Sequence, residues 1–432
     1  MSVIEQFLTT VDLPRMAPVR QIFPDDAVRD VAAAVRAEFA KPGNAALVRK
    51  GMTIAIGVGS RGLADLPVLV RTTVEELLRL GARPFIVPAM GSHGGATAEG
   101  QQALLAKLGV TEASAGCPIR SSMDTVKLGS LPNGLPILMD KAAMQADGIV
   151  VINRVKPHTS FSGMIESGLA KMITIGLGKQ QGAESCHAHG FGMMAENVLE
   201  MARFKLAHSP VLFGIATVEN GYDRVARVEL VRNERILDRE PELLKEARAS
   251  MPRILFRPLD VLIVDRMGKE FSGTGMDPNI TGRASTPYVN TTQEVGKMAV
   301  LDLTDSSSGN ATGIGLADIC TRRLHDKIDL IATYANCVTS TVLAGARIPV
   351  IMENDRDAMR MAVKTCNAPD PSKLRMVRVP NTLHLEEIHV SEALLPEVEA
   401  SDALEVLGPA RAAEFDATGN FTVSEREAFA HG

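Results

Sequence analysis

The chain alternates short apolar runs with amphipathic stretches, and this alternation limits its possible folds more than any other feature. Residues 52–58 (MTIAIGV) predict a buried strand, residues 65–80 an amphipathic helix that Gly81 ends, and residues 84–88 (PFIVP) the next strand. Strands separated by helices are joined by crossover connections and favour parallel pairing with helices on the faces of the sheet. The sequence therefore predicts an α/β fold with mainly parallel sheets.

The same alternation continues along the chain and suggests two α/β domains. Further strands are predicted at residues 148–152, 211–217 and 260–265, and further helices at residues 97–108 and 194–207. A length of 432 residues suits two domains better than a single core.

The domain boundary is placed where a charged stretch, residues 232–253, gives way to a new strand. Residues 1–255 then form an N-terminal catalytic and cofactor-binding α/β domain, and residues 256–432 form a C-terminal α/β domain. The tail, residues 399–432, is acidic and rich in alanine, and we expect one packed helix there.

Composition and charge restrict the possible partners. With 45% hydrophobic and 22% charged residues the chain has the composition of a globular protein, and its formal net charge of -5 argues against a nucleic-acid or anionic-membrane surface. No apolar run reaches the roughly 20 residues of a membrane span, and the N-terminus lacks a signal-peptide pattern. We expect a cytoplasmic protein with a small-molecule partner and leave its oligomeric state open.

The cysteines indicate neither a disulfide framework nor a thiolate zinc site. They are odd in number, widely spaced and form no CxxC pair: Cys117, Cys186, Cys320, Cys337 and Cys366. A soft metal in this chain would therefore need sulfur ligands from another source.

Four glycine-rich or polar loops directly follow predicted strands, where ligands bind in open α/β sheets. They span residues 57–62, 90–97, 153–163 and 272–283. In the first, GVGSRG, Ser60 and Arg61 suit a phosphate or carboxylate, but the loop has neither dinucleotide-fingerprint nor P-loop spacing. An ordinary tight turn between strand and helix is the alternative.

Two histidines lie in two of these loops, His93 in GSHGGAT and His158 in KPHTSFSG. Each is either a structural histidine bonded to its loop or a general acid or base. Two histidines from neighbouring loops could face each other across a small ligand, and inversion of a stereocentre requires acid–base groups on both faces.

A lysine and two further histidines follow. Lys171 lies in the apolar stretch GLAKMITIGLG, where burial would make its amine nucleophilic, although a surface lysine with a buried stem is the alternative. His187 and His189 would share one face of a strand but not of a helix. One of them could bind a metal whose remaining ligands are not supplied by the protein.

These residues, in this order and spacing, resemble the LarA family of nickel-dependent lactate racemases, also known as domain of unknown function 2088. The motifs that carry the resemblance are GSR, GSH, KPH followed by FSG, a downstream lysine and a histidine, and it extends over nearly the whole chain. It implies two α/β domains with the active site between them. It also implies a nickel-pincer nucleotide, pyridinium-3,5-bisthiocarboxylic acid mononucleotide, whose sulfurs and carbon bind nickel.

The resemblance implies a role for each motif residue. Lys171 would tether the cofactor, His187 would bind nickel, and Ser60 and Arg61 would hold the cofactor phosphate. His93 and His158 would exchange the hydroxyl proton of a 2-hydroxy acid while hydride transfer inverts its α-carbon. The implied partners are that substrate and, transiently, the proteins of cofactor biosynthesis.

The chain departs from the family pattern at three places. FSG is followed by MIESGLAK, which places Lys171 later than expected and keeps Lys156 and Lys179 as alternatives, as His189 is for His187. Val58 stands near the place of a usual acidic residue.

The third departure is the loop DPNITGR, which differs from the family's DQN-type loop and implies a changed substrate. Arg283 could clamp a carboxylate, with Lys269 as the alternative, and Asn279 or Thr281 could bond a hydroxyl. A glycine-rich hinge is compatible with both roles. Two other functions remain open: a zinc-dependent hydrolase or lyase using the three histidines, and a non-catalytic cofactor-binding homologue.

Overall fold

The computed structural model describes residues 3–60, 62–291, 294–427 and 429, which form two compact units. One unit is Asp25–Met251, and the other joins the residues up to Pro24 with those from Pro252 onward. The chain thus crosses between units twice. The boundary expected after residue 255 lies near the second crossing, whereas the N-terminal segment, assigned from the sequence to the first domain, belongs to the C-terminal unit.

The Asp25–Met251 unit is built on a five-stranded sheet in the order β3-β2-β6-β7-β8. Its strands are β2 (Thr53–Val58), β3 (Arg83–Pro88), β6 (Gly148–Arg154), β7 (Val211–Glu219) and β8 (Val225–Arg232). The first four pair in parallel, and β8 adds an antiparallel edge. The four strands predicted here and their parallel pairing are confirmed.

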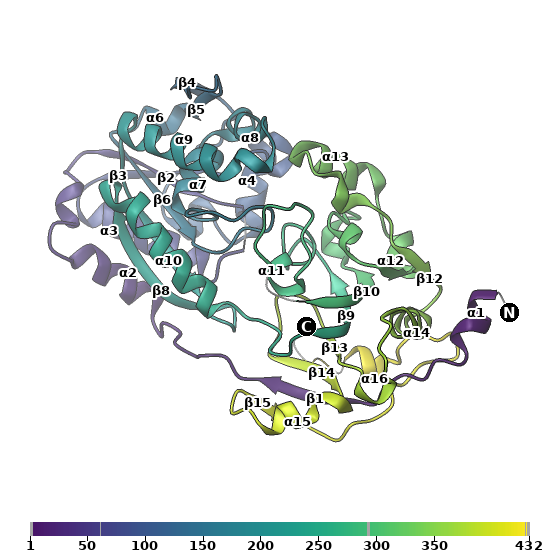
Figure 1. The fold of residues 1–432 in the computed structure, drawn as a ribbon. Helices are drawn as coiled ribbons and strands as arrows, with labels where there is room; N and C mark the ends of the chain where they lie inside the picture. The colour runs from purple at the N-terminus through teal and green to yellow at the C-terminus, as the bar shows by residue number, and fades with distance from the viewer. Residues whose placement is uncertain (1–2, 61, 292–293, 428, 430–432) are drawn as a thin grey trace. The chain divides into compact units, whose positions relative to one another are not determined.

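Helices cover both faces of this sheet (Figure 1). They are α2 (Val31–Ala40), α3 (Leu66–Arg79), α4 (Ala98–Lys107), α5 (Glu112–Ala115), α6 (Lys141–Met144), α7 (Leu169–Lys171), α8 (Lys179–His187), α9 (Met194–His208) and α10 (Ile236–Ser250). The predicted helices at 65–80, 97–108 and 194–207 are confirmed as α3, α4 and α9. A hairpin of β4 (Thr125–Ser130) and β5 (Pro136–Asp140) completes the unit.

Successive residues of β7 point to opposite faces of the sheet, and this shows which helices lie on which face. Phe213 and Ile215 are buried in the same core as Phe39 of α2, whereas Gly214 between them points to the opposite face. A Cβ on Gly214 would stand 2.6 Å from Leu169 Cδ1, so only glycine lets α7 pack this closely. The short helix that ends at Lys171 therefore rests directly on the sheet.

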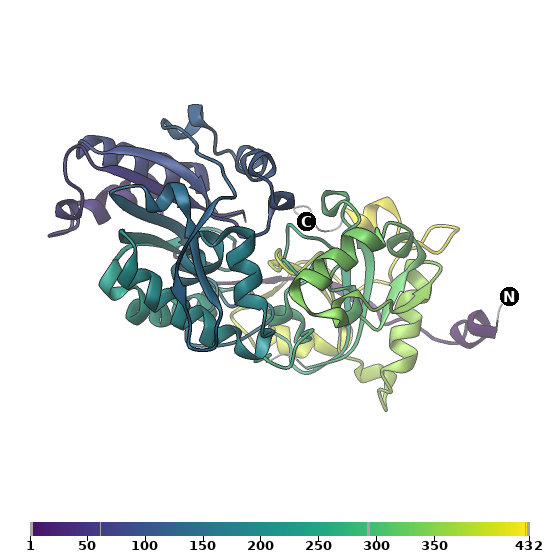
Figure 2. The ribbon, with the colours of Figure 1, turned by 90° about the horizontal axis from the view of Figure 1, so that it is seen from above.

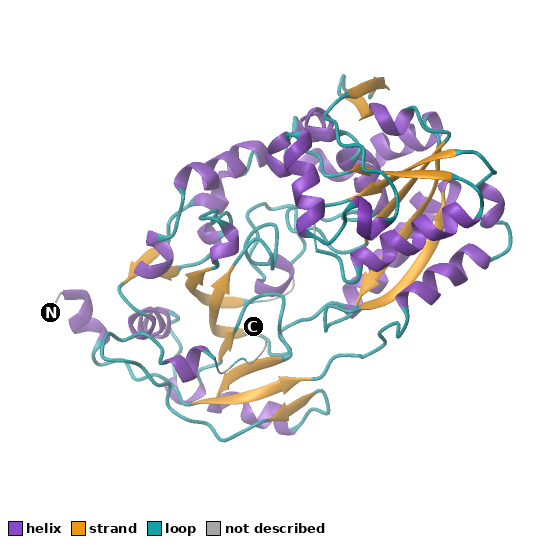
Figure 3. Cartoon of the chain, turned by 180° about the vertical axis from the view of Figure 1, so that it is seen from behind, coloured by secondary structure: helices purple, strands orange, loops and turns teal. Residues whose placement is uncertain are grey.

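The second unit contains an eight-stranded mixed sheet in the order β12-β11-β10-β9-β13-β14-β1-β15. The strands are β1 (Met16–Gln21), β9 (Leu259–Met267), β10 (Val295–Leu303), β11 (Ile319–Thr321), β12 (Val350–Met352), β13 (Met376–Val379), β14 (Glu387–Ser391) and β15 (Leu404–Val406). From β12 to β13 the pairing is parallel, and beyond β13 it is antiparallel. Figure 3 shows the strands with the helices beside them.

The helices of this unit are mostly short. They are α1 (Val3–Leu8), α11 (Pro278–Thr281), α12 (Arg322–Asp326), α13 (Leu330–Ser340), α14 (Asp355–Thr365), α15 (Leu395–Glu399) and α16 (Val423–Arg426). None of the helices that the structure describes, in either unit, is long and apolar enough to cross a membrane.

Both ends of the chain are incorporated into this unit, as the purple and yellow segments of Figure 2 show. β1 lies between β14 and β15, and both pairings are antiparallel. The single helix expected for residues 399–432 is wrong within the described part of the tail, which contains β15, extended segments and α16. The tail is extended because its polar groups bond to the sheet and not along a helix.

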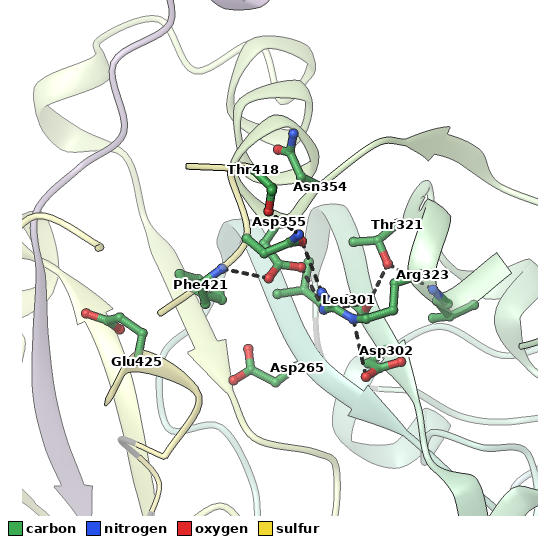
Figure 4. A network of polar contacts seen from close by, with 12 residues as sticks. Asp265, Leu301, Asp302, Thr321, Arg323, Asn354, Asp355, Thr418, Phe421 and Glu425 are labelled. Carbon is green, nitrogen blue, oxygen red and sulfur yellow. Dashed lines mark hydrogen bonds and ion pairs between the residues drawn. The ribbon is translucent and has the colours of Figure 1, made fainter. Parts of the chain in front are cut away.

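A buried polar network holds the tail in place (Figure 4). Asp355 at the start of α14 accepts the Phe421 N–H at 2.9 Å and pairs with Arg323 at 2.8 Å. Arg323 also donates to the Asn420 side chain at 3.0 Å. Sequence periodicity could not reveal this arrangement, because every one of these contacts joins residues distant in sequence.

Candidate active site

The candidate site lies at the carboxyl edge of the five-stranded sheet, where three loops meet residues 168–178. At the end of β6, Asn153 donates a hydrogen bond to the Gly168 carbonyl at 2.7 Å. After β3, the Gly91 N–H bonds to the Gly176 carbonyl at 3.2 Å. After β2, a Cβ on Gly59 would stand 3.0 Å from Met172 Cε. The segment that carries Lys171 is therefore in contact with all three candidate loops of this unit.

Ser60 and His93 are brought together although 33 residues separate them, because the Ser60 hydroxyl bonds to His93 Nδ1. His93 itself is exposed, and Gly91, Gly94 and Gly95 around it all have positive φ. Glycine adopts a positive φ without strain, and because these glycines have no side chains they leave the His93 ring accessible. The two loops after β2 and β3 thus present a hydroxyl and an imidazole to one point. Arg61, the third residue expected there, lies outside the described residues.

His158 is half-buried in a loop that a carboxylate holds from inside. Glu166 Oε2 accepts the His158 N–H at 2.7 Å, and Oε1 accepts the Gly163 N–H at 2.8 Å and pairs with Arg248 of α10 at 2.5 Å. Burial raises the pKa of Glu166 above its usual range, while these donors oppose the shift. Removing either Glu166 or Arg248 would leave the charge of the other without its ion-pair partner.

The ring of His158 is oriented by its own loop. The Ser160 N–H donates to His158 Nδ1 at 3.0 Å, so a neutral ring carries its proton on Nε2. Phe161 lies against the ring with centroids 4.4 Å apart, and Phe191 lies at 6.3 Å. In this tautomer Nε2 can donate its proton to a ligand but has no lone pair with which to accept one.

The longer interval between FSG and Lys171 is absorbed within a closed loop. Lys156 and Ser167 form a two-way backbone bridge, with N–H to carbonyl distances of 2.8 and 3.2 Å. The intervening residues, Glu166 among them, fold back on themselves. Lys171 follows this loop and ends α7, which packs on the sheet.

His187 ends α8, and one nitrogen of its ring keeps a lone pair that could bind a metal. Its Nδ1 bonds to the Ala183 carbonyl at 2.6 Å, and because a carbonyl only accepts, Nδ1 carries the proton and Nε2 keeps a lone pair. Phe191 meets the His187 ring edge-on, with centroids 5.6 Å apart, and so lies against both His158 and His187. His189 is exposed in the turn after α8, so the two histidines do not share a face.

Burial lowers the pKa of His187 below 6.5; the Ala183 carbonyl opposes this shift, and the positive charge of Lys171 adds to it. We expect the His187 resonances in the cofactor-free protein to titrate below 6.5. Lys171→Met should raise this midpoint, because removing a nearby positive charge favours imidazolium, whereas Lys127→Met on the exposed β4 hairpin should not. An unchanged midpoint in Lys171→Met would mean that the lysine is not near His187.

The alternative lysine Lys179 has a structural role. Its side chain is fully buried, pairs with the buried Asp140 at 2.9 Å and donates to the Pro88 carbonyl at 2.6 Å. Burial lowers its pKa, and Asp140 opposes the shift. A covalent link at this nitrogen would leave Asp140 buried without its partner, which is costly. Lys171, by contrast, is half-buried at the end of α7.

The residues expected to bind substrate from the second unit are Asn279 and Arg283. Asn279 Nδ2 donates to Asp277 Oδ1 at 2.8 Å at the start of α11. Arg283 pairs with Asp318 at 2.6 Å and donates to the carbonyls of Leu316, Val295 and Gly296. Lys269 bonds to the Gly273 carbonyl at 2.8 Å and to the Asn336 side chain. Carboxylate binding at Arg283 would have to compete with Asp318.

The histidines do not form a three-ligand metal centre. Among the residues with a described position, no group of three or more His, Cys, Asp or Glu could hold a metal ion. The zinc alternative required His93, His158 and His187 as a set, so this geometry counts against it. One histidine with an available nitrogen instead suits a metal bound mainly by a cofactor.

The sequence did not reveal the residues that hold the backbone of the His158 loop and of the segment around Lys171. The sequence places Lys205 in a predicted helix, Glu240 and Arg248 in a charged stretch and Glu166 in the segment MIESGLAK, without a role at the site. A signal existed in residues 236–250, where apolar residues recur at helical spacing among the charges.

Comparisons with known proteins report a family match for part of the chain and a fold likeness. Residues 13–200 match the family model of the lactate racemase N-terminal domain. A crystal structure of a protein from Thermotoga maritima is similar at a TM-score of 0.52 and 14% identity, over 84% of this chain and 99% of that one, which shows a shared fold. The lactate racemase apoprotein from Thermoanaerobacterium thermosaccharolyticum matches at a TM-score of 0.49 and 15% identity, over 85% and 99%. No curated protein matches the sequence.

Proposed function

We propose that this chain, whose residues 13–200 match the lactate racemase N-terminal domain, is a racemase or epimerase of a 2-hydroxy acid. The family supports an isomerase of the racemase type, and the identity of the substrate belongs to the proposal. One observation carries it furthest: the Nδ1 of His187 bonds to the Ala183 carbonyl, which leaves Nε2 with a lone pair for a metal.

These residues fit the nickel-pincer nucleotide. His187 offers a single neutral imidazole ligand, and burial lowers its pKa, which favours the neutral form that a metal requires. The cofactor would bring the soft ligands that no cysteine cluster supplies, with Lys171 as its covalent anchor and Ser60 and Arg61 near its phosphate. When bound, it would supply reversible hydride acceptance at the substrate α-carbon.

The proton chemistry would fall to His93 and His158. One imidazole accepts the substrate hydroxyl proton as the carbon is oxidised, and the other donates a proton to the carbonyl oxygen as the carbon is reduced on its opposite face. Ser60 would hold His93 through Nδ1, and the Ser160 N–H would hold His158 through Nδ1. To accept a proton at Nε2, His158 would have to carry its ring proton on Nδ1 and so give up the Ser160 N–H.

The substrate carboxylate needs a cationic partner. We keep Arg283 and Asn279 as proposed contacts from the loop of residues 272–283. Arg283 would exchange its Asp318 ion pair for a bidentate bond to the substrate. Because this loop departs from the family pattern, we expect a substrate with a side chain other than the methyl group of lactate.

The proposal is tested by offering a panel of 2-hydroxy acids to cofactor-loaded protein in D₂O. The expected result is a change of configuration for at least one acid, with little deuterium at the α-carbon, because hydride returned internally does not exchange with solvent. Configuration is followed by chiral chromatography and deuterium by NMR.

Two results would count against the proposal. Extensive deuterium at the α-carbon would favour a carbanion route, and no inversion by protein with stoichiometric nickel would leave a binding function. Protein made without the cofactor pathway is the matched control and should be inactive.

A further inference from the structure

The turn that carries Lys171 has an unusual hydrogen-bond pattern. Residues Met172–Gly176 form a π-helical turn, with the Leu177 N–H bonded to the Met172 carbonyl at 2.9 Å. Such wide turns leave neighbouring carbonyls without partners in the helix, and they are frequent at functional sites. Thr174 provides a side-chain donor for two carbonyls near the lysine. Its hydroxyl donates to the Ala170 carbonyl at 2.9 Å and to the Lys171 carbonyl at 3.2 Å.

The start of the turn is held by a buried carboxyl group from α10. Glu240 is 1% exposed, and its Oε2 accepts the Ala170 N–H at 2.9 Å. Burial raises the pKa of Glu240 to about 7, while the N–H groups of Ala170 and Leu169 lower it. A Cβ on Gly168 would stand 2.2 Å from Glu240 Oε1, so the glycine lets this carboxyl group reach the backbone.

The end of the turn is held by a buried amine from α9. Lys205 is 1% exposed, and its Nζ donates to the carbonyls of Ile173 and Thr174 at 2.9 and 2.8 Å. Both carbonyls belong to the π-helical turn, and buried polar groups without partners are costly. An acceptor thus meets the N–H groups before Lys171, and a donor meets the carbonyls after it.

We propose that Glu240 and Lys205 are positioning residues for Lys171: they fix both ends of its turn and so hold its amine at the place of covalent attachment. The importance of that place rests on the proposed function. The hydrogen bonds of Glu240 and Lys205 described above go to backbone groups of the turn, so we assign both residues an action through the backbone. A short turn of this kind has too few internal bonds to be rigid by itself.

The test uses cofactor-free full-length protein. Amide hydrogen exchange of residues 168–178 reports on the turn, and competitive acylation with acetic anhydride across pH, read by peptide mass spectrometry, reports the titration midpoint of the Lys171 amine. Lys205→Met and Glu240→Leu should each speed exchange by about tenfold or more, since buried partners lose their bonds, and should shift the Lys171 midpoint.

Matched controls lie on the same helices. Arg203→Met on α9 and Glu242→Gln on α10 change exposed side chains and should leave exchange and midpoint as in the wild type. Glu240→Gln, which retains an acceptor oxygen, should stay within about threefold of the wild-type exchange. Thr174→Val, nearly isosteric, loosens the same turn from within and serves if Lys205→Met does not fold.

The outcomes separate this proposal from the racemase function. Folded Lys205→Met, Glu240→Leu or Thr174→Val with wild-type exchange at 168–178 and an unchanged Lys171 midpoint would overturn the positioning role. In cofactor-loaded protein the tethered fraction of Lys171 should fall in the same variants. If wild-type Lys171 carries no cofactor at all, the proposed function fails while the cofactor-free measurements still decide the role of the two residues.

Discussion

Lys171→Arg is expected to leave the protein without covalently bound cofactor and to reduce racemisation of any 2-hydroxy acid to background. Arginine keeps the positive charge, but its guanidinium stays protonated and does not act as an amine nucleophile. The variant preserves the half-buried stem and the local charge, so the fold of α7 should persist. Intact mass and peptide mass spectrometry of protein from cofactor-producing cells measure the loss.

The matched control is Lys156→Arg, because Lys156 was the other accessible candidate for the tether. It should keep the mass increment on the peptide that contains Lys171. Lys179 is unsuited as a control, since its ammonium group is paired with Asp140 in the interior. A mass increment that survives in Lys171→Arg and moves to another lysine would refute the assignment.

His93→Gln and His158→Gln should each lower kcat for racemisation by roughly 10²–10⁴-fold, the usual contribution of a positioned acid or base. Glutamine keeps hydrogen-bonding capacity but cannot gain and lose a proton near neutral pH. Both directions of the reaction should slow equally, because each histidine is the base in one direction and the acid in the other. The covalent increment on Lys171 should persist, which separates lost chemistry from lost cofactor.

Two further histidines sharpen this test. His208→Gln alters an exposed ring stacked on Phe204, 4.1 Å between centroids, and should leave kcat unchanged. His189→Gln should likewise leave the nickel content unchanged if His187 is the ligand. Wild-type kcat in His93→Gln and in His158→Gln would remove both residues from the mechanism.

The parallel core of the first unit could be predicted closely, because its strands and helices are long and strongly periodic. Apolar runs at residues 52–58, 84–88 and 148–152 correspond to β2, β3 and β6 within one or two residues at each end. Ligands gather at the carboxyl ends of parallel strands, so the sequence predicted Ser60 and His93 at one edge of the sheet. The structure brings these two residues, 33 positions apart, into a hydrogen bond.

The tail and the supporting residues could not be predicted, because their interactions are non-local. β1 pairs with strands near residue 390, and the extended tail is held by Asp355 and Arg323. Glu240 and Arg248 lie in a stretch whose charge indicated only a boundary, yet one bonds α7 and the other the His158 loop. Pattern along a sequence reports which face is buried, not which distant backbone group a buried charge will meet.

The sequence by itself determined the α/β class, the strands that end at the site and the types of side chain available for acid–base and metal chemistry. Tertiary structure alone decided which nitrogen of His187 is available and that Lys179 is tied to Asp140. It also decided that the residues inserted before Lys171 close into a loop around Glu166. The physical reason is that periodicity and residue type are local properties, whereas tautomer, burial and ion pairing depend on neighbours that only folding brings within a few ångströms.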